Sequence, residues 1–331
     1  MAKAEKSLND LLYDIKRIQQ HRVELTDERI ESIYDQLMAD LDAFLAEGYR
    51  KYSDSDGRLY LKYLDEHRGR AAFLQQIVDN VDNMAPQLRD QMQELIDATY
   101  EECYRGMASS VKAAYTDPEL AELLSDIDVN PQTLRSAMNN NISKLTLPAL
   151  MEAHRAQIIY QIQQELNIGL LNGDRYETMA ARIADRVGVS RGKAMNITRT
   201  ETHRNVESGF MDCAEHLQKG LEGSGFIYAG TWRNMGDERV RPQVRYKTKS
   251  GWKTKIRKNG ADHIKMEGQT VKVGELFDLG RGVKAKAPSQ SGVAAHDCNC
   301  RCFVEYNLMT VEEFAKATKQ TVEQVRKKYG L

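Results

Sequence analysis

Several common sequence signals are missing from this chain of 331 residues. No apolar run approaches the roughly 20 residues that a membrane-spanning helix needs. The N-terminal stretch MAKAEKSLNDLLYDIK has no apolar signal core, so export through a signal peptide is not expected. Phosphate loops, a Ser/His/Asp ordering and paired-carboxylate motifs are also missing, as are long internal repeats and low-complexity tracts. The chain therefore shows none of these familiar hydrolase motifs.

Cysteine is scarce and odd in number. Two of the five cysteines are isolated, and three form a cluster; they are Cys103 and Cys213, then Cys298, Cys300 and Cys302. An odd count without a secretory signal fits a reducing compartment better than a disulfide framework. The mean hydropathy of −0.60 and the 29% of charged residues are typical of a soluble protein.

The near-neutral net charge conceals an asymmetry along the chain. Residues 1–135 hold 27 acidic and 16 basic residues, whereas the remainder holds 21 acidic and 31 basic ones. Such a difference indicates two surfaces with different partners, although ordinary variation between domains gives the same pattern.

Apolar residues at helical spacing dominate the first two thirds of the chain. They predict helices over 5–50, with a new helix starting at Thr26-Asp27, and over 59–111, with Pro86 near the start of a later helix. Further helices are expected over 150–171, 176–187 and 193–217. Breaks are expected at 116–118, at 129–131 and at the turn formed by residues 171–174.

Glycines, turns and β-branched residues take over after Gly220. Short strands are expected at 226–232, 270–273 and 302–304, with a basic hairpin within 244–256. Two terminal helices follow at 311–318 and 321–329, the first capped by Thr310 and Glu313. The predicted fold is mainly α. A helical N-terminal region (1–150) precedes a small α+β domain (151–309) with a basic insertion at 244–260, and a terminal helical pair (310–331) serves as a docking element.

Four short motifs follow one another between residues 197 and 306. They are Arg199-Thr200-Glu201 on a helix, Trp232 before Asp237-Glu238-Arg239-Val240-Arg241, His263 before Gly268, and Asn299-Cys300-Arg301-Cys302. In this order they resemble the Mu F-like head morphogenesis (minor capsid) family of tailed bacteriophages, over roughly residues 155–306. Two departures are the insertion after Arg241 and the additional Cys298.

The resemblance implies a minor protein of the phage head interior. Such a protein associates with the portal and with capsid or scaffold subunits, and it assists head assembly, DNA packaging or delivery. It would reside in the virion, and in the host cytoplasm during assembly, with no enzymatic activity. The alternative is a metal-dependent nuclease or other hydrolase acting on phage DNA, which requires a metal or base to converge on a water site.

The motif residues have both a structural and a chemical interpretation. Arg199 and Glu201 could form a catalytic pair as in ADP-ribosyltransferases, but an anchor to the backbone of later turns is the favoured reading, with Arg204 in ion-pairing reach of Glu201. Asp237 is expected to start a turn held by arginines. The complete set predicted as a structural motif is Arg199, Glu201, Trp232, Asp237, Arg239, His263, Gly268, Asn299 and Arg301.

The cysteine cluster and His263 are the best candidates for a metal site. Three thiolates from Cys298, Cys300 and Cys302 with one imidazole, from His263 or His296, would complete a tetrahedral structural zinc site. Alternate residues of an extended strand lie about 6.5–7 Å apart, however, so Cys-x-Cys can share one ion only at a kink. Small buried thiols are the competing interpretation, with no cofactor.

The basic insertion alternates cationic residues with aromatic ones, a pattern typical of nonspecific contact with double-stranded DNA. A solvated hairpin without a partner is the competing reading. The candidate contact residues are Arg245, Lys247, Lys249, Trp252, Lys253, Lys255, Arg257 and Lys258.

Overall fold

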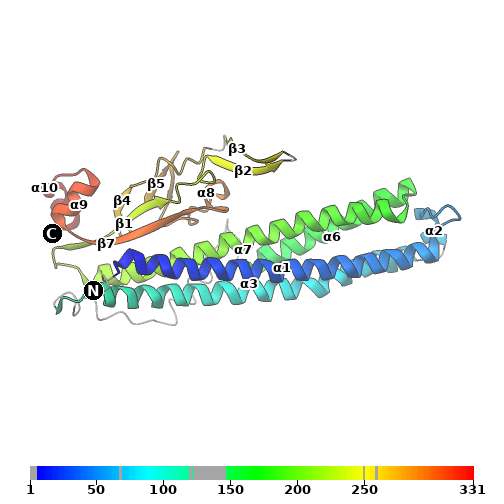
Figure 1. The fold of residues 1–331 in the computed structure, drawn as a ribbon, viewed down its shortest axis with the longest axis horizontal. Helices are drawn as coiled ribbons and strands as arrows, with labels where there is room; N and C mark the ends of the chain where they lie inside the picture. The colour runs from blue at the N-terminus through cyan, green and yellow to red at the C-terminus, as the bar shows by residue number, and fades with distance from the viewer. Residues whose placement is uncertain (1–5, 67–68, 119–121, 123–146, 249, 258–259) are drawn as a thin grey trace. The chain divides into compact units, whose positions relative to one another are not determined.

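The computed structural model describes residues 6–66, 69–118, 122, 147–248, 250–257 and 260–331. Its helices are α1 (Leu8–Tyr52), α2 (Leu61–Glu66), α3 (Arg70–Ala114), α6 (Leu147–Asn172), α7 (Tyr176–Gly220), α8 (Ala294–Asp297), α9 (Val311–Thr318) and α10 (Val322–Tyr329). The strands are β1 (Phe226–Asn234), β2 (Gln243–Thr248), β3 (Gly251–Ile256), β4 (Thr270–Lys272), β5 (Phe277–Gly280), β6 (Val283–Ala285) and β7 (Cys302–Thr310) (Figure 1). None of the helices in these described ranges has the length and apolar character needed to cross a membrane.

Packing divides the chain into two compact units, each built from separate segments. The helical unit comprises residues 23–95 and 145–198, and the mixed unit comprises 1–22, 96–144 and 199–331. The helices α1, α3 and α7 therefore contribute residues to both units. The predicted domains were continuous stretches with a boundary near residue 150, and that division remains a prediction.

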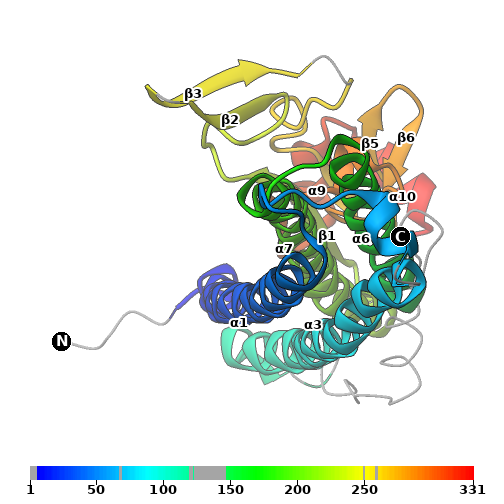
Figure 2. The same cartoon turned by 90° about the vertical axis from the view of Figure 1, so that its right-hand side faces the viewer.

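The helical unit is made of long helices that lie side by side, as the end-on view in Figure 2 shows. Their buried faces carry apolar residues at three- and four-residue spacing, such as Ile30, Leu37 and Leu41 on α1. One polar contact lies among them: the Tyr34 hydroxyl is 2.8 Å from Nε2 of His154 and 3.4 Å from the Ser190 carbonyl. Three helices thus meet at one buried hydrogen-bond network.

The mixed unit is centred on a three-stranded antiparallel sheet in the order β4-β1-β7. Side chains alternate across β1, so Tyr228 and Trp232 face the main core, whereas Ile227 and Ala229 face α9 and α10. Both terminal helices carry capping boxes, Thr310 with Glu313 and Thr321 with Gln324. The sheet is therefore covered on both faces.

Strand β7 is an edge strand, and its outward backbone groups are bound by side chains rather than by another strand. The amides of Val304, Tyr306 and Leu308 donate to Glu207 Oε2 (3.1 Å), Asn9 Oδ1 (3.1 Å) and the Tyr115 hydroxyl (3.3 Å). Asn9 Nδ2 also donates to the Tyr306 carbonyl at 3.2 Å. Residues at i, i+2 and i+4 point the same way from a strand, so side chains from α1, from α7 and from Tyr115 just after α3 close this edge.

The predicted fold class and most of the predicted elements are confirmed, including the basic hairpin, both terminal helices and the turn before Asp174, where Gly173 has a φ of 64°. The break expected at 129–131 lies outside the described residues. Three other expectations were wrong. Thr26-Asp27 lies inside α1, Pro86 lies inside α3, and α7 runs without a break through Gly188 and Gly192. Burial of a continuous apolar face outweighs the local cost of a proline or glycine, which is about 1–3 kcal/mol.

Candidate functional site

The motif residues converge beside one face of α7 in the mixed unit. Thr200 Oγ1 accepts a hydrogen bond from the Asn299 amide at 3.1 Å, and seven residues later Glu207 holds the Val304 amide. Because residues at i, i+3 and i+7 share a helix face, this face of α7 runs alongside the segment 299–304. Glu207 is 1% exposed and also pairs with Lys16 Nζ at 2.9 Å.

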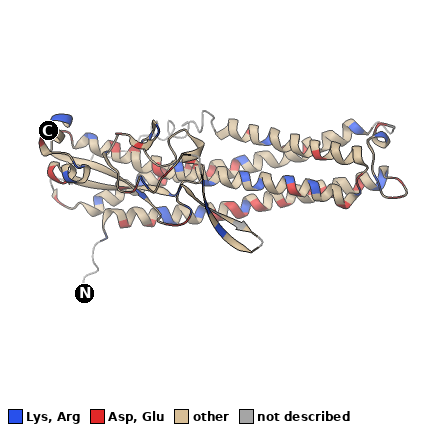
Figure 3. Cartoon of the chain, turned by 90° about the horizontal axis from the view of Figure 1, so that it is seen from above, with Lys and Arg blue, Asp and Glu red and all other residues tan. Residues whose placement is uncertain are grey.

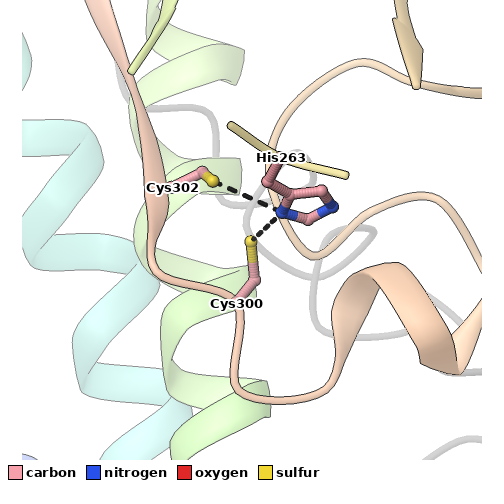
Figure 4. Close-up of side chains that lie close together, drawn as sticks. All are labelled: His263, Cys300 and Cys302. Carbon is pink, nitrogen blue, oxygen red and sulfur yellow. Dashed lines mark hydrogen bonds between the residues drawn. The ribbon is translucent and has the colours of Figure 1, made fainter. Parts of the chain in front are cut away.

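His263, Cys300 and Cys302 form a buried cluster (Figure 4). Nδ1 of His263 lies 3.5 Å from the Cys300 sulfur and 3.4 Å from the Cys302 sulfur. The three side chains are between 1% and 4% exposed. Cys302 is the first residue of β7, Cys300 lies two residues before it, and Asn299 before them has a left-handed φ of 53°. The two sulfurs and a ring nitrogen of His263 all lie within 4.8 Å of one another, so the separation expected for a fully extended Cys-x-Cys does not arise.

Two aromatic rings surround this cluster. His296 stacks on His263, with its Nδ1 3.1 Å from Nε2 of His263, and Trp232 packs edge-on against His263 with ring centroids 5.7 Å apart. Hydrogen bonding with the Cys302 thiol, and then with the His263 ring, lowers the pKa of the Cys300 thiol well below its ordinary value. The same contact with Cys300, together with burial, raises the pKa of Cys302. One thiolate is thus favoured over two.

Arg241 joins three segments of this site. Its carbonyl accepts the amides of His263 (2.9 Å) and Ile264 (3.2 Å), while its guanidinium donates to the Cys298 carbonyl. The loop before Cys298 is held by Asp297, whose carboxylate accepts the Ser291 amide at 3.0 Å and the Gly292 amide at 2.8 Å. Buried charges thereby fix loops that have little regular structure of their own.

A second cross-link involves Asp237. Its Oδ2 pairs with Arg301 Nη2 at 2.7 Å and with Arg239 Nη2 at 3.3 Å, and its Oδ1 accepts the Arg239 amide at 3.0 Å. Burial alone would raise the pKa of Asp237, but the Arg239 amide and the two guanidinium groups outweigh it and lower the pKa. This geometry is that of an aspartate turn held by two arginines.

Gly268 closes the turn that follows His263. Its amide donates to the Trp232 carbonyl at 2.9 Å, and the Trp232 amide donates to the Gln269 carbonyl at 2.8 Å. The φ of Gly268 is 79°, a left-handed value that side chains with a Cβ rarely adopt. A glycine is therefore needed here for a backbone reason.

Arg199 and Glu201 do not share an accessible site. Arg199 is exposed, whereas Glu201 is 3% exposed and lies 3.6 Å from Nε of Arg204. Burial raises the pKa of Glu201 to about 7, against the opposing effect of Arg204. The backbone anchors observed on this helix are Thr200, which the sequence motif included without a role, and Glu207, which it did not include. The only sequence signal for Glu207 was its place on the same helix face.

The predicted metal set is brought together only in part. Cys298 is exposed and ends α8, so its sulfur is not in the cluster formed by the other three residues. The reason is local: Cys298 precedes the left-handed Asn299, so the chain turns between Cys298 and the buried pair. Of the predicted motif residues, Trp232, Asp237, Arg239, His263, Gly268, Asn299 and Arg301 belong to the connected site.

The basic hairpin formed by β2 and β3 is exposed, unlike the buried cluster. Trp252, Lys253, Lys255 and Arg257 are exposed, whereas Lys249 and Lys258 lie outside the described residues, and the side chains of Arg245 and Lys247 are not described. Tyr246 pairs in register with Lys253, and Lys255 Nζ lies 5.0 Å from the Tyr246 ring centroid. Side chains alternate along a strand, so Trp252 faces away from Lys253 and Lys255. The predicted contact residues therefore do not all share one face.

Two comparisons place this chain among known proteins, one with a family model and one with individual relatives. Residues 160–305 match the model of the family described as Phage Mu protein F like protein. This region belongs to that family. The minor head protein GP7 of Bacillus phage SPP1 is 26% identical over 280 residues, which cover 85% of this chain and 81% of that protein. The matched region contains the cluster of His263, Cys300 and Cys302 and the cross-links made by Arg241 and Asp237.

A second relative is an enzyme by name. The NAD(+)--arginine ADP-ribosyltransferase EFV of Enterococcus faecalis (strain ATCC 700802 / V583) is 26% identical over 175 residues. The match covers 53% of this chain but only 31% of that protein, so that protein's activity cannot be carried over. No solved structure gives a significant match to the chain.

Proposed function

We propose that this protein is a minor head protein that acts in head morphogenesis of a tailed phage. The observation that carries the proposal is the likeness to a minor head protein over 85% of this chain, which includes helices outside the Mu F like region. The site supports it, because the motif residues bind backbone groups and one another. The protein would reside in the virion head, and in the host cytoplasm during assembly.

We assign no catalytic role to the site. His263, Cys300 and Cys302 are at most 4% exposed, so a substrate has no access to them. The Asp237 carboxylate is engaged by two guanidinium groups and one amide, which leaves no free acid or base there. These observations favour the assembly role over a metal-dependent nuclease or other hydrolase.

Loss of the gene tests the assembly role. Deleting it from the phage that encodes it should give heads with reduced DNA content or infectivity, or with altered protein composition. Complementation with the intact gene should restore all three. Heads that match the parent phage in all three measurements would contradict the proposal.

The portal is the partner that we propose for the helical unit. Three large apolar side chains on α6 and α7 are exposed there: Tyr160 at 64%, Leu171 at 69% and Val189 at 62%. Acidic and basic residues are interspersed along the same helices (Figure 3), so the surface combines apolar contact with charge pairing. Capsid or scaffold subunits are the competing partners.

Co-expression with the portal protein tests this contact. The double variant Tyr160→Asp/Leu171→Asp should lose co-purification with the portal, because it places two charges in the apolar contact. The matched control is Ile18→Asp, an equally exposed apolar residue of the mixed unit at 55%. Equal capture of both variants would rule out this surface as the portal contact.

Nonspecific contact with double-stranded DNA is the role that we propose for the hairpin. Lys253 and Lys255 are exposed on the face that also carries Tyr246, and no carboxylate pairs with either lysine among the ion pairs of the described residues. Two ammonium groups beside an aromatic ring can bind adjacent phosphates. Trp252 lies on the opposite face and is not part of this contact.

The salt dependence of DNA binding tests the hairpin. In the variant Lys253→Gln/Lys255→Gln, the slope of log affinity against log salt concentration should fall by about 2, since two phosphate contacts are lost. Lys265→Gln, an exposed lysine outside the hairpin, is the matched control and should keep the parent slope. An unchanged slope in the double variant would reject the hairpin as the DNA contact.

A further inference from the structure

The two buried thiols and the imidazole of the cluster compete for one lone pair. A neutral imidazole has one acceptor nitrogen, which can accept one thiol proton well but not two. Both sulfurs nevertheless lie at hydrogen-bond distance from the same atom, Nδ1 of His263, at 3.5 and 3.4 Å. One thiol can donate to this nitrogen while the second donates to the first sulfur, and a cation shared by all three atoms would replace both of these S–H hydrogen bonds.

The distances agree with a tetrahedral ion. Zinc–sulfur bonds of about 2.3 Å and zinc–nitrogen bonds of about 2.0–2.1 Å place the sulfur and nitrogen ligands about 3.5 Å apart. The observed separations of 3.5 and 3.4 Å match this value. All three ligand atoms lie within 4.8 Å of one another. One ion can therefore reach each of them without a large movement of the backbone.

The second nitrogen of His263 is oriented as in metal sites. Nε2 lies 3.1 Å from Nδ1 of the stacked His296, to which it can donate its proton. That bond leaves the lone pair of His263 on Nδ1, which faces the two sulfurs. On the other side, the buried indole N–H of Trp232 lies beside the Cys302 sulfur. A metal-bound thiolate there would be a stronger acceptor for this N–H than a neutral thiol.

A fourth ligand is available from α7. Thr200 contacts Asn299 and Glu207 contacts Val304, so His203, between them on the same helix face, lies opposite Cys300–Cys302. Nδ1 of His203 is buried and has no hydrogen-bond partner among the described residues. His203 is not within 4.8 Å of all three other ligand atoms, so its side chain has to turn toward the ion.

We propose that His263, Cys300 and Cys302 bind one structural zinc ion and that His203 completes its coordination. Two thiolates and two imidazoles are a donor set that suits tetrahedral zinc. The ion would join the turn that contains His263, the segment before β7 and the helix α7. These three parts of the mixed unit are not strands of one sheet. This inference holds whether or not the assembly role is correct.

Metal analysis of the purified full-length protein tests the site. We expect about one zinc per chain, and zinc X-ray absorption with two sulfur neighbours near 2.3 Å and nitrogen neighbours near 2.0–2.1 Å. Zinc below about 0.2 per chain, another metal at full occupancy, or a Cys300–Cys302 disulfide in the intact mass would each overturn the proposal.

Matched variants locate the ligands. Cys300→Ser and His263→Ala should lose the zinc, whereas Cys298→Ser, an exposed cysteine of the same loop, should retain it. If the ligand variants do not fold, thiol modification of the parent protein should release zinc to a chromophoric chelator at one equivalent. Retention of zinc by both ligand variants would overturn the site. Unchanged zinc affinity in His203→Ala would overturn the assignment of His203.

Discussion

Single residues hold the site together by binding backbone groups from distant parts of the chain. Arg241 does so for three segments: its carbonyl takes the amides of His263 and Ile264, and its buried guanidinium binds the Cys298 carbonyl. Replacing Arg241 by alanine keeps its carbonyl and removes only the guanidinium, which leaves the Cys298 carbonyl without this donor. The loss of such a charged hydrogen bond costs more than the loss of an exposed ion pair.

Arg241→Ala should lower the free energy of unfolding of the mixed unit by about 2 kcal/mol, the usual magnitude for a lost charged hydrogen bond. Urea unfolding followed by tryptophan fluorescence measures this. The chain has two tryptophans, so Trp252→Phe leaves buried Trp232 as the reporter. Arg239→Ala is the control, since its 53%-exposed side chain should contribute less than about 1 kcal/mol. Equal effects of the two substitutions would contradict this account.

His154 makes the stability of the helical unit depend on pH. Burial, with a smaller effect of Lys193, lowers the pKa of His154 from 6.5 to about 4. The folded helical unit thus favours neutral His154, so this contribution is complete above pH 6.5 and is lost as pH falls to about 4. Its size is about 3 kcal/mol.

The non-titrating variant His154→Gln isolates that contribution. Between pH 7 and pH 4, the parent protein should lose about 3 kcal/mol more stability than the variant, as measured by urea unfolding followed by circular dichroism. Parallel pH profiles for the two proteins would show that His154 is not the group responsible.

Residue types and spacing identified many site residues but not the roles of all of them. His263, Asp237, Arg301 and the Cys-x-Cys pair stood out because polar and sulfur groups at fixed separations are unusual in a core. Glu207 carries no such signal, since one carboxylate on a long helix is ordinary, and Thr200 belonged to a motif in which only its charged neighbours were given roles. Their importance comes from the segment that lies opposite them, which only the fold reveals.

At the scale of elements, the edge of β7 is the most distinctive arrangement. Three side chains from helical segments bind its outward amides, so no further strand is needed to satisfy this edge. An exposed edge would invite pairing with another chain. The first turns of α1 therefore help to stabilise the sheet, although they are far from it in sequence.

Asn9→Ala should raise the hydrogen-exchange rate of the Tyr306 amide about five- to tenfold, since one hydrogen bond of about 1 kcal/mol is lost. Exchange at the other β7 amides should change less. Arg17→Ala is the control on the same helix, because the Arg17 side chain is 84% exposed and pairs with Asp14 one turn earlier. Unaltered protection of Tyr306 in Asn9→Ala would contradict the edge-closing role.

The existence of most elements could be predicted, whereas some boundaries and the hairpin of β5 and β6 could not. Long apolar periodicity specified the helices, but residues such as Pro86 and Gly188 suggested ends that tertiary packing overrides. The strands at 277–280 and 283–285 are too short for an alternating pattern to be recognised, and glycines lie in and beside them.

The whole molecule consists of two compact units that share three long helices. Only the mixed unit contains the cluster of His263, Cys300 and Cys302. Zinc at this cluster would stabilise that unit and leave the helical unit unaffected, because metal binding contributes to folding only where its ligands are.

Hydrogen exchange with and without a zinc chelator checks this separation. Peptides from β1 and β7 should exchange faster after chelation, whereas peptides around Ile30–Leu41 of α1 should not change. Faster exchange throughout both units would contradict a local structural role for the metal. The metal content of the protein before and after treatment is the necessary control.

We propose that this protein is a component of the phage head. Quantitative mass spectrometry of purified DNA-filled heads measures this, with peptides of this chain compared with those of the portal protein. We expect the chain in the heads at a few copies for each portal. A chain that is abundant in the infected cell but missing from both precursor and DNA-filled heads would contradict the claim.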